Sequence, residues 1–454
     1  MLGNLSRLIV IVIVIATARQ IGRFPTDGVT ASAHQHESRP KAHHLLLTTL
    51  TNSRWQTMLS FLVRSTAKRA TLSPSPKPLP RFPTLRHKSS ALSPPYLLDD
   101  YLPRYALLTP LQEARKRSEA YAHLSNCNLC PRLCGVNRFK ERGTCLIGSD
   151  VTVNTIAPHF GEEPCLQGSH GSGSVFFSGC NLRCVFCQNH DIAHQKSGFD
   201  LTPEELGEWY LKLQDVGGVH NINLVTPEHV VPQVVLSILH AKALGLRVPI
   251  VYNTSSFDSL ASIALLDGLV DIYLPDFKVW TTSTSRRLLK ADDYASTARE
   301  SIRAMHAQVG DLSFTADGLA KKGVLLRHLV MPGQEEEGKH IVRWLAENVS
   351  RDLYVHVMEQ YHPRAHVGRQ KRGRLGSGRA GALAGGEVQG RGDVVEGMVE
   401  PGAQPAGEGA KRAVRYEEIN RAVKMEEVDS VRAAAEKAGL WRFCEPAESA
   451  GFHV

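Results

Sequence analysis

Three cysteines in the stretch FFSGCNLRCVFCQN have a spacing that is typical of an iron–sulfur cluster loop. They are Cys180, Cys184 and Cys187, in a CxxxCxxC pattern. Three thiolates on one short loop can ligate three irons of a cubane cluster and leave the fourth iron without a protein ligand. Gly179 and Asn181 suit the tight turns that such a loop needs. A zinc loop is the alternative use of the same residues.

A second group of cysteines precedes this loop. Its members are Cys127, Cys130, Cys134 and Cys145. Four thiolates can close a tetrahedral zinc site or ligate a second iron–sulfur cluster, and their spacing does not separate the two. Redox-active or metal-free thiols are the third interpretation. The two remaining cysteines, Cys165 and Cys444, are not expected to bind a metal.

Six short apolar runs, separated by helical patterns, must position these cysteines. The predicted strands are residues 175–178, 221–225, 249–252, 270–274, 324–330 and 353–358. This alternation predicts an α/β fold, a partial (βα)6 barrel with a small N-terminal Cys-rich lobe. One of the helices should begin with a capping box at Thr202 and Glu205. The cluster loop follows the first strand, and such folds place their chemistry at the carboxyl ends of the strands.

Polar side chains also occur near the ends of the later predicted strands. They are Thr226, Asn253, Asp276, Lys278, Arg327 and His328. Phe186, just before the third cysteine, is a further candidate, since its ring would cover the cluster or meet an adenine. Asp276 and Lys278 are two residues apart, so both should project to the same face. Each residue alone could be structural, but the set together favours a binding site.

The stretch GSVFFSGCNLRCVFCQN resembles the cluster motif of the radical S-adenosylmethionine superfamily. Within the superfamily the sequence resembles the pyruvate formate-lyase activating enzyme-like branch, over about residues 126–362 and 414–440. The resemblance implies a [4Fe–4S] cluster on the CxxxCxxC cysteines, with S-adenosylmethionine on the open iron. Reductive cleavage would give methionine and a 5′-deoxyadenosyl radical, which abstracts hydrogen from a substrate. That branch also has a block like the four-cysteine group.

The resemblance to the Asp-x-Lys pair of the activating enzymes further implies that Asp276 and Lys278 face the cofactor, and we expect the other polar residues named above to contact the cofactor or the substrate. The Gly-Gly-Glu type motif that the superfamily often has after the second strand is missing, and Thr226-Pro227 stands in its place. An electron donor of the flavodoxin or ferredoxin type would be required, and a protein glycine is one candidate substrate. The alternative function is a non-catalytic iron–sulfur or zinc-binding protein that serves in electron transfer or as a scaffold.

The net charge of +8 is concentrated at the start of the chain. Residues 1–98 contain thirteen Lys and Arg against two acidic residues, so the remainder carries −3. This partition argues against nucleic acid as a partner. We expect residues 1–98 to be a disordered basic leader. From Met58 the leader is rich in Arg and Ser and lacks acids, which favours a mitochondrial address; a cytoplasmic location and a secretory signal starting at Met1 are alternatives.

The remaining chain divides by composition into four predicted parts. These are a Cys-rich lobe (99–172), the barrel core (173–363), a Gly/Arg-rich low-complexity insertion (364–413) and a helical C-terminal segment completing the core (414–454). The Arg-Gly pairs of the insertion lack interleaved aromatic residues, which argues against RNA contact. A retained intron or a gene-model error would also explain the presence of residues 364–413. No apolar run reaches the length of about 18 residues that spans a membrane.

Overall fold

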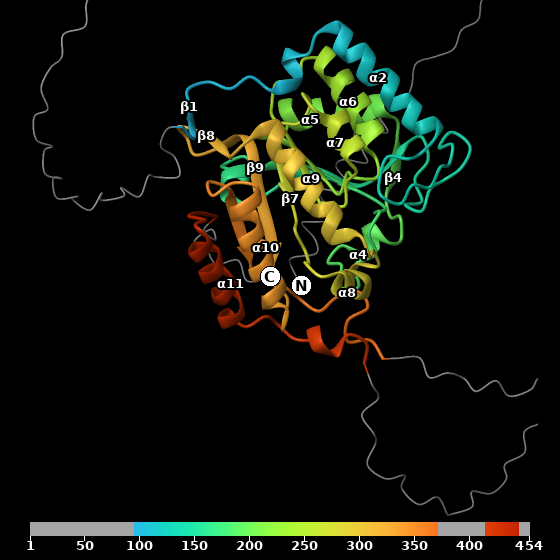
Figure 1. The fold of residues 1–454 in the computed structure, drawn as a ribbon. Helices are drawn as coiled ribbons and strands as arrows, with labels where there is room; N and C mark the ends of the chain where they lie inside the picture. Colours follow the sequence, from blue (N-terminus) through green and yellow to red (C-terminus); the bar gives the residue numbers. More distant parts are fainter. Residues whose placement is uncertain (1–94, 371–413, 445–454) are drawn as a thin grey trace, which may run out of the picture. The chain divides into compact units, whose positions relative to one another are not determined.

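A central sheet of parallel strands organises the protein (Figure 1). The computed structural model describes residues 95–370 and 414–444. The six parallel strands are β3 (Ser172–Phe177), β5 (Ile222–Val225), β6 (Ile250–Thr254), β7 (Ile272–Pro275), β9 (Ala320–Leu329) and β10 (Tyr354–Met358). Each predicted strand overlaps one of them, and they pair in chain order. The predicted α/β fold with a mainly parallel sheet is confirmed.

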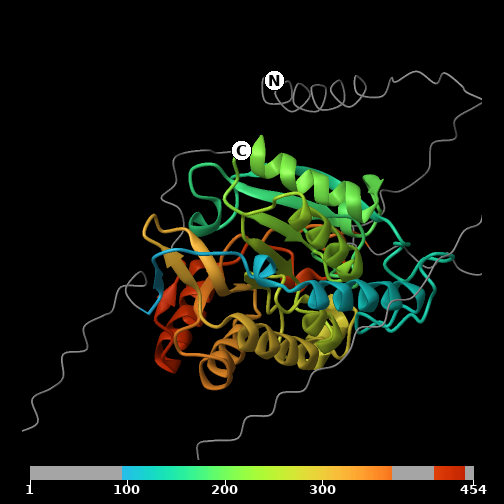
Figure 2. The ribbon, with the colours of Figure 1, turned by 90° about the horizontal axis from the view of Figure 1, so that it is seen from above.

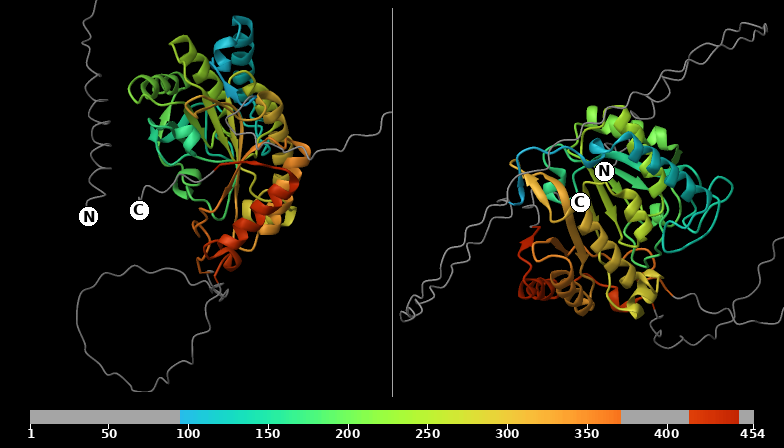
Figure 3. Two further views of the ribbon diagram at one scale, coloured as in Figure 1. Left: turned by 90° about the vertical axis from the view of Figure 1, so that its left-hand side faces the viewer. Right: turned by 45° about the horizontal axis from the view of Figure 1, so that its top comes forward.

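Helices connect these strands. They are α5 (Pro203–Asp215), α6 (Val231–Ala243), α7 (Leu260–Leu266), α9 (Tyr294–Val309) and α10 (Glu335–Asn348). In sequence order α5 packs on α6, α6 on α7 and α7 on α9, and Figures 2 and 3 show these helices around the outside of the sheet. The predicted capping box of α5 is present, because Thr202 Oγ1 accepts from the Glu205 backbone N–H at 3.2 Å and Glu205 Oε2 accepts from the Thr202 N–H at 2.9 Å.

The structure contains elements that the sequence patterns did not indicate. They are β1 (Leu97–Leu98), α2 (Pro110–Ser125), β2 (Val151–His159), β4 (Phe199–Leu201) and β8 (Ser313–Thr315). Strand β2 pairs antiparallel with β3 and carries β4 on its other side, so the sheet continues past the first barrel strand. Helix α2 packs on the outside of α6. Shorter elements fill the connections: η1 (Arg104–Leu107), α3 (Pro164–Gln167), α4 (His190–Ala193), α8 (Thr282–Thr284), η2 (Ser285–Leu289) and η3 (Glu417–Ile419).

The last described part of the chain packs on the end of the sheet. Helix α11 (Met425–Ala438) lies against α10, and β11 (Arg442–Phe443) pairs in parallel with β10. Gln370 and Val414 form an antiparallel bridge, so the two flanks of residues 371–413 meet. Most of the predicted leader and of the Gly/Arg-rich insertion, together with the last ten residues, lies outside the described residues. None of the described helices is long and apolar enough to cross a membrane.

Candidate active site

The CxxxCxxC loop leaves the carboxyl end of β3 and is held by backbone contacts on both sides. The N–H of Val185 donates to the Leu288 carbonyl at 2.9 Å, which ties the loop to η2. Gly179 has a φ of +82°, and a Cβ there would lie 2.6 Å from the Cys145 carbonyl oxygen. Glycine is therefore required at this turn for two reasons, its backbone conformation and the close approach of a second chain segment.

The three thiols of this loop line one cavity of about 440 Å³. Cys180 is 8% exposed and Cys184 9%, while Cys187 is half-buried. Burial raises the pKa of the Cys184 thiol to about 12, although the nearby Lys278 ammonium acts in the opposite direction. Thiolates here would need compensating positive charge, which a bound metal supplies.

The other walls of the cavity come from the carboxyl ends of the parallel strands. Every predicted contact residue except one lies in this lining: Phe186, Thr226, Asn253, Asp276, Lys278 and Arg327. Met358 and Gln360, which end β10 and follow it, also line the cavity. Six strand ends thus contribute to one site, as the fold requires for strands that run in parallel.

An ion network anchored on Asp276 crosses the floor of the cavity. Its carboxylate accepts from Lys278 Nζ at 2.6 Å and from Arg327 Nε at 2.7 Å. Burial alone would raise the pKa of Asp276, but the two cations lower it to about 2. Arg327 also donates to Asn253 Oδ1 at 2.7 Å. The network joins β6, β7 and β9 and holds two fixed positive charges beside the three thiols.

Two strand-end turns next to this network adopt strained backbone conformations. Thr226 has a φ of +61° and Ser256 a φ of +64°, a region that non-glycine residues rarely occupy. Such outliers cluster at functional sites. Between them Ser255 lines the cavity, and its Oγ is a buried group without a hydrogen-bond partner among the described residues. A polar ligand in the cavity would satisfy this hydroxyl.

Glu162 joins the network, although no pattern in the sequence singled it out. Its Oε2 lies 3.7 Å from Arg327 Nη1, and its side chain is almost fully buried. Burial raises the pKa of Glu162 to about 7; Arg327 opposes this shift and the neighbouring Glu163 adds to it. Glu162 precedes the first barrel strand, and the pair Glu162-Glu163 matches no known motif. Only the structure therefore shows that Glu162 belongs to the site.

His328 lies apart from the other predicted cofactor contacts. It does not line the cavity, and its Nδ1 is 2.7 Å from the Phe277 carbonyl oxygen. Its Nε2 faces Gly338 of α10, where an added Cβ would lie 2.5 Å from this nitrogen. Successive residues of a strand point to opposite faces. Because Arg327 faces the cavity, His328 must face the helical layer, which corrects the expectation drawn from sequence.

The four-cysteine group lies directly behind the cluster loop. Arg138 is buried among these thiols: its Nε donates to Cys127 Sγ at 3.1 Å and its Nη1 to the His229 carbonyl at 2.7 Å. No three sulfurs of the group lie within 4.8 Å of one another in the described residues. Four sulfurs around one zinc ion at about 2.3 Å would be about 3.8 Å apart. The sulfurs are close, but not arranged as a closed zinc site.

This lobe and the cluster loop are fastened together. Arg132 Nε donates to the Asn181 carbonyl at 2.8 Å, and Arg183 Nη2 donates to the Thr144 carbonyl at 2.9 Å. With the Gly179 approach to Cys145, three contacts join the lobe to the loop. The lobe is therefore a support for the cluster loop, whatever its own thiols bind.

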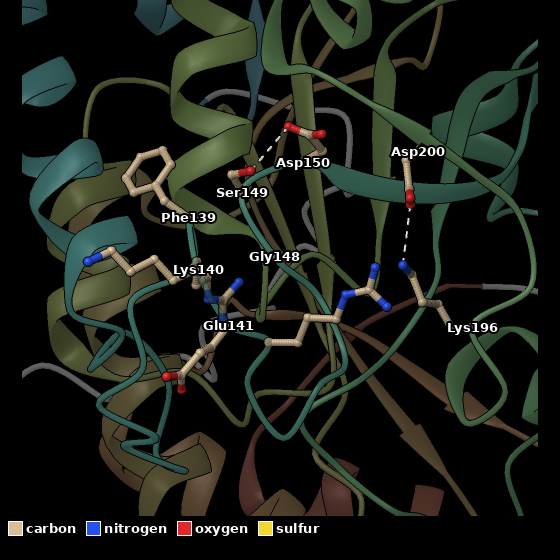
Figure 4. A pocket seen from close by; sticks show the side chains of 10 residues that line it. Phe139, Lys140, Glu141, Gly148, Ser149, Asp150, Lys196 and Asp200 are labelled. Carbon is tan, nitrogen blue, oxygen red and sulfur yellow. Dashed lines mark hydrogen bonds and ion pairs between the residues drawn. The ribbon is translucent and has the colours of Figure 1, made fainter.

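A second hollow of about 220 Å³, shown in Figure 4, lies on the outer side of the lobe. Its lining carries both signs of charge, and Lys196 pairs with Asp200 at 3.4 Å. Its lining contains no cysteine, histidine or unpaired buried nucleophile. The cavity above the cysteine loop is the better candidate for chemistry.

The central part of the chain is similar to known proteins. Residues 174–345 match the family model of the radical SAM superfamily. An uncharacterized protein of Methanocaldococcus jannaschii is 33% identical over 253 residues, covering 52% of this chain and 66% of that protein.

Among solved structures, methylornithine synthase is 17% identical, with a TM-score of 0.29. The alignment covers 56% of this chain and 61% of methylornithine synthase. SuiB of Streptococcus suis bound to S-adenosylmethionine is 12% identical, with a TM-score of 0.29 over 39% and 38%. This chain spans at most 66% of each of these proteins.

Proposed function

We propose that the protein is a radical S-adenosylmethionine enzyme, because residues 174–345 match the family model of the radical SAM superfamily. In this proposal Cys180, Cys184 and Cys187 hold a [4Fe–4S] cluster. When bound, the cluster and S-adenosylmethionine supply an electron and a 5′-deoxyadenosyl radical for hydrogen abstraction. The single observation that carries the proposal is the convergence of three thiols and a buried ion network on one cavity.

The residues of the cavity fit such a cofactor in their chemistry. Three thiols on one loop leave room for an external ligand at a fourth iron. Fixed cations at Lys278 and Arg327 suit a carboxylate, and the free Ser255 hydroxyl suits a polar group. Phe186 is buried, lines the cavity and has its ring centroid 6.2 Å from that of Tyr361, so it offers an apolar wall.

This chain's own contribution would be orientation and the exclusion of water. Asp276 fixes the positions of Lys278 and Arg327, and the pKa of its carboxyl lies far below neutral, so it stays ionised there. Strained turns with positive φ at Thr226 and Ser256 follow two adjacent strands, and Thr226 and Ser255 line the cavity. An electron carrier without a substrate would not need these groups, which is why the enzyme is favoured over the carrier or scaffold.

The test is anaerobic reconstitution with iron and sulfide, followed by dithionite and S-adenosylmethionine. We expect methionine and 5′-deoxyadenosine from the wild-type protein and none from Cys184→Ala. Cys165→Ala is the matched control, because this thiol lies outside the cavity and should leave the yield unchanged. Equal product from Cys184→Ala and wild type would refute the assignment of the cluster to this loop.

The substrate and partners are proposed from the resemblance to pyruvate formate-lyase activating enzyme-like proteins. A protein glycine is the proposed target, and a flavodoxin- or ferredoxin-like protein the proposed reductant. A glycyl-radical product would be detected by its electron paramagnetic resonance signal on the partner protein. Its absence, with 5′-deoxyadenosine still formed, would point to another hydrogen donor and leave the radical chemistry intact.

The four-cysteine group is proposed to bind zinc or an auxiliary cluster. Metal analysis of wild type and Cys127→Ala separates the two. Loss of one zinc at constant iron assigns zinc, whereas loss of iron assigns a cluster. An unchanged content of both metals would mean that this group holds neither.

The mitochondrial address is proposed from the basic stretch that begins at Met58. A reporter fused to residues 58–98 should accumulate in mitochondria. A diffuse cytosolic signal would favour the cytoplasmic alternative.

A further inference from the structure

Three histidines converge beside the mouth of the cavity, outside the set of residues that the proposed chemistry uses. They are His190, His194 and His366. One ring nitrogen of each lies within 4.8 Å of the others, and in the described residues no other set of three or more His, Cys, Asp or Glu comes this close. The ring centroids of His190 and His194 are 4.6 Å apart, and those of His190 and His366 are 5.2 Å apart.

The fold brings these side chains together from two distant segments. His190 is the first residue of the four-residue helix α4 and His194 is its C-cap, so a separation of four residues places both on one face. His366 follows β10, and its backbone N–H donates to the Val185 carbonyl at 2.9 Å, inside the cluster loop. Gln188 strengthens the same junction by donating to the His362 carbonyl at 2.9 Å. These contacts hold the two segments side by side, so that the three rings come within reach of one another.

We propose that His190, His194 and His366 bind a divalent transition-metal ion of the zinc class. Neutral imidazoles suit such ions, and three of them leave one position for water or a carboxylate. Asp191 Oδ1 lies 3.7 Å from His190 Nδ1, but this exposed carboxylate is not among the groups that lie within 4.8 Å of one another. The bound ion would link the segment after Cys187 to the segment after β10. Both segments contribute residues to the lining of the cavity. This inference is independent of the proposed radical chemistry.

Burial and nearby charges lower the pKa values of two of the three imidazoles, those of His194 and His366. Burial, and then the nearby His190, lowers the pKa of His194 to about 4. Arg183, the cation near His194, donates to the carbonyls of Thr144 and Ala193 at 2.9 and 3.4 Å, and Arg369, Arg415 and Lys290 lie near His366.

Cobalt(II) is the probe for the test, added to the full chain with its iron sites loaded. We expect one additional equivalent of cobalt whose absorption lacks thiolate charge-transfer bands. The affinity should fall at least about tenfold in His194→Ala and in His366→Ala. His170→Ala is the matched control, because His170 and His220 form a similar ring pair, 5.1 Å apart, without a third histidine. Equal affinity in all four proteins, or cobalt with thiolate bands only, would overturn the proposal.

A second measurement needs no variant and so does not depend on whether the variants fold. Zinc should protect His190, His194 and His366 of the wild-type protein from acylation by diethyl pyrocarbonate, as read by peptide mass spectrometry. His170 should react equally with and without zinc. Unchanged reactivity of the three histidines at saturating zinc would also overturn the proposal.

Discussion

At the residue scale, the site depends on one buried carboxylate between two buried cations. Asp276 accepts hydrogen bonds from Lys278 and Arg327 on opposite oxygens. Removing one partner of a buried ion pair is costly because the remaining charge stays in a medium that solvates it poorly. The stability of the empty protein should therefore report on the integrity of its site.

Asp276→Asn should lower the free energy of unfolding by about 3–5 kcal/mol, since two cations lose their counter-charge. Urea unfolding measures this difference. Asp292→Asn is the matched control, because Asp292 pairs with Arg286 at the surface at 2.8 Å, and it should unfold like the wild type. Equal losses in the two variants would contradict the network described above.

Glu162 gives a prediction in pH. Burial raises its pKa to about 7, against an ordinary value of about 4.3. Its contribution to stability is therefore complete below pH 4.3 and is lost as the pH rises through 7. Relative to Glu162→Gln, which does not titrate, the wild type should lose on the order of 1–3 kcal/mol between pH 4.5 and 7.5. Parallel stability curves for the two proteins over this range would exclude a raised pKa.

At the element scale, the positions of the strands could be predicted from the sequence. The face of the sheet to which each side chain points could be predicted only for some residues. Buried parallel strands appear in sequence as continuous apolar runs, which is why β5 and β7 were evident. Helix α2 was missed because most of its side chains are exposed and it shows little apolar periodicity, although Thr109 caps it. The spacing of Asp276 and Lys278 correctly placed both on one face. Arg327 and His328 are adjacent, so one of them had to point away, and the sequence does not say which.

Strand β9 carries Arg327 into the site and depends on one glycine. Gly323 has a φ of +120°, and a Cβ there would lie 2.5 Å from the Asp311 carbonyl oxygen. Gly318 also has a positive φ, of +81°, but open space around it. Gly318→Ala should cost about 1–2 kcal/mol from backbone strain alone. Gly323→Ala should cost about 1–3 kcal/mol more, because packed backbone must move. Thermal unfolding of both variants checks the difference; similar losses would show that the backbone of Asp311 yields freely.

At the whole-molecule scale, the described flanks of residues 371–413 are joined to each other. Its flanks pair directly, since the Gly368 N–H donates to the Arg415 carbonyl and the Arg415 N–H to the Arg369 carbonyl, both at 2.9 Å. The closing cost of a connection grows slowly with its length, about 0.6 kcal/mol per doubling. The amino-acid composition placed the start of the Gly/Arg-rich insertion at residue 364. The bridge between Gln370 and Val414 shows that the paired flank extends to residue 370.

Replacing residues 371–413 by four Gly and Ser residues should leave the unfolding free energy unchanged or raise it by up to about 2 kcal/mol. Chemical denaturation of the purified proteins measures this. The matched control removes residues 364–413, which also deletes the paired flank and the buried Val367, and should be destabilised. A large loss from the shorter deletion would show that the segment contributes to the fold.

The three contacts that fasten the four-cysteine lobe onto the cluster loop also separate two ways of acting on that loop. On the lobe side they involve Arg132, the Thr144 carbonyl and the Cys145 carbonyl. None of these lobe residues lines the cavity that Cys180, Cys184 and Cys187 face. A partner that shifted the lobe would therefore alter the geometry of the cluster loop without competing with a ligand in the cavity.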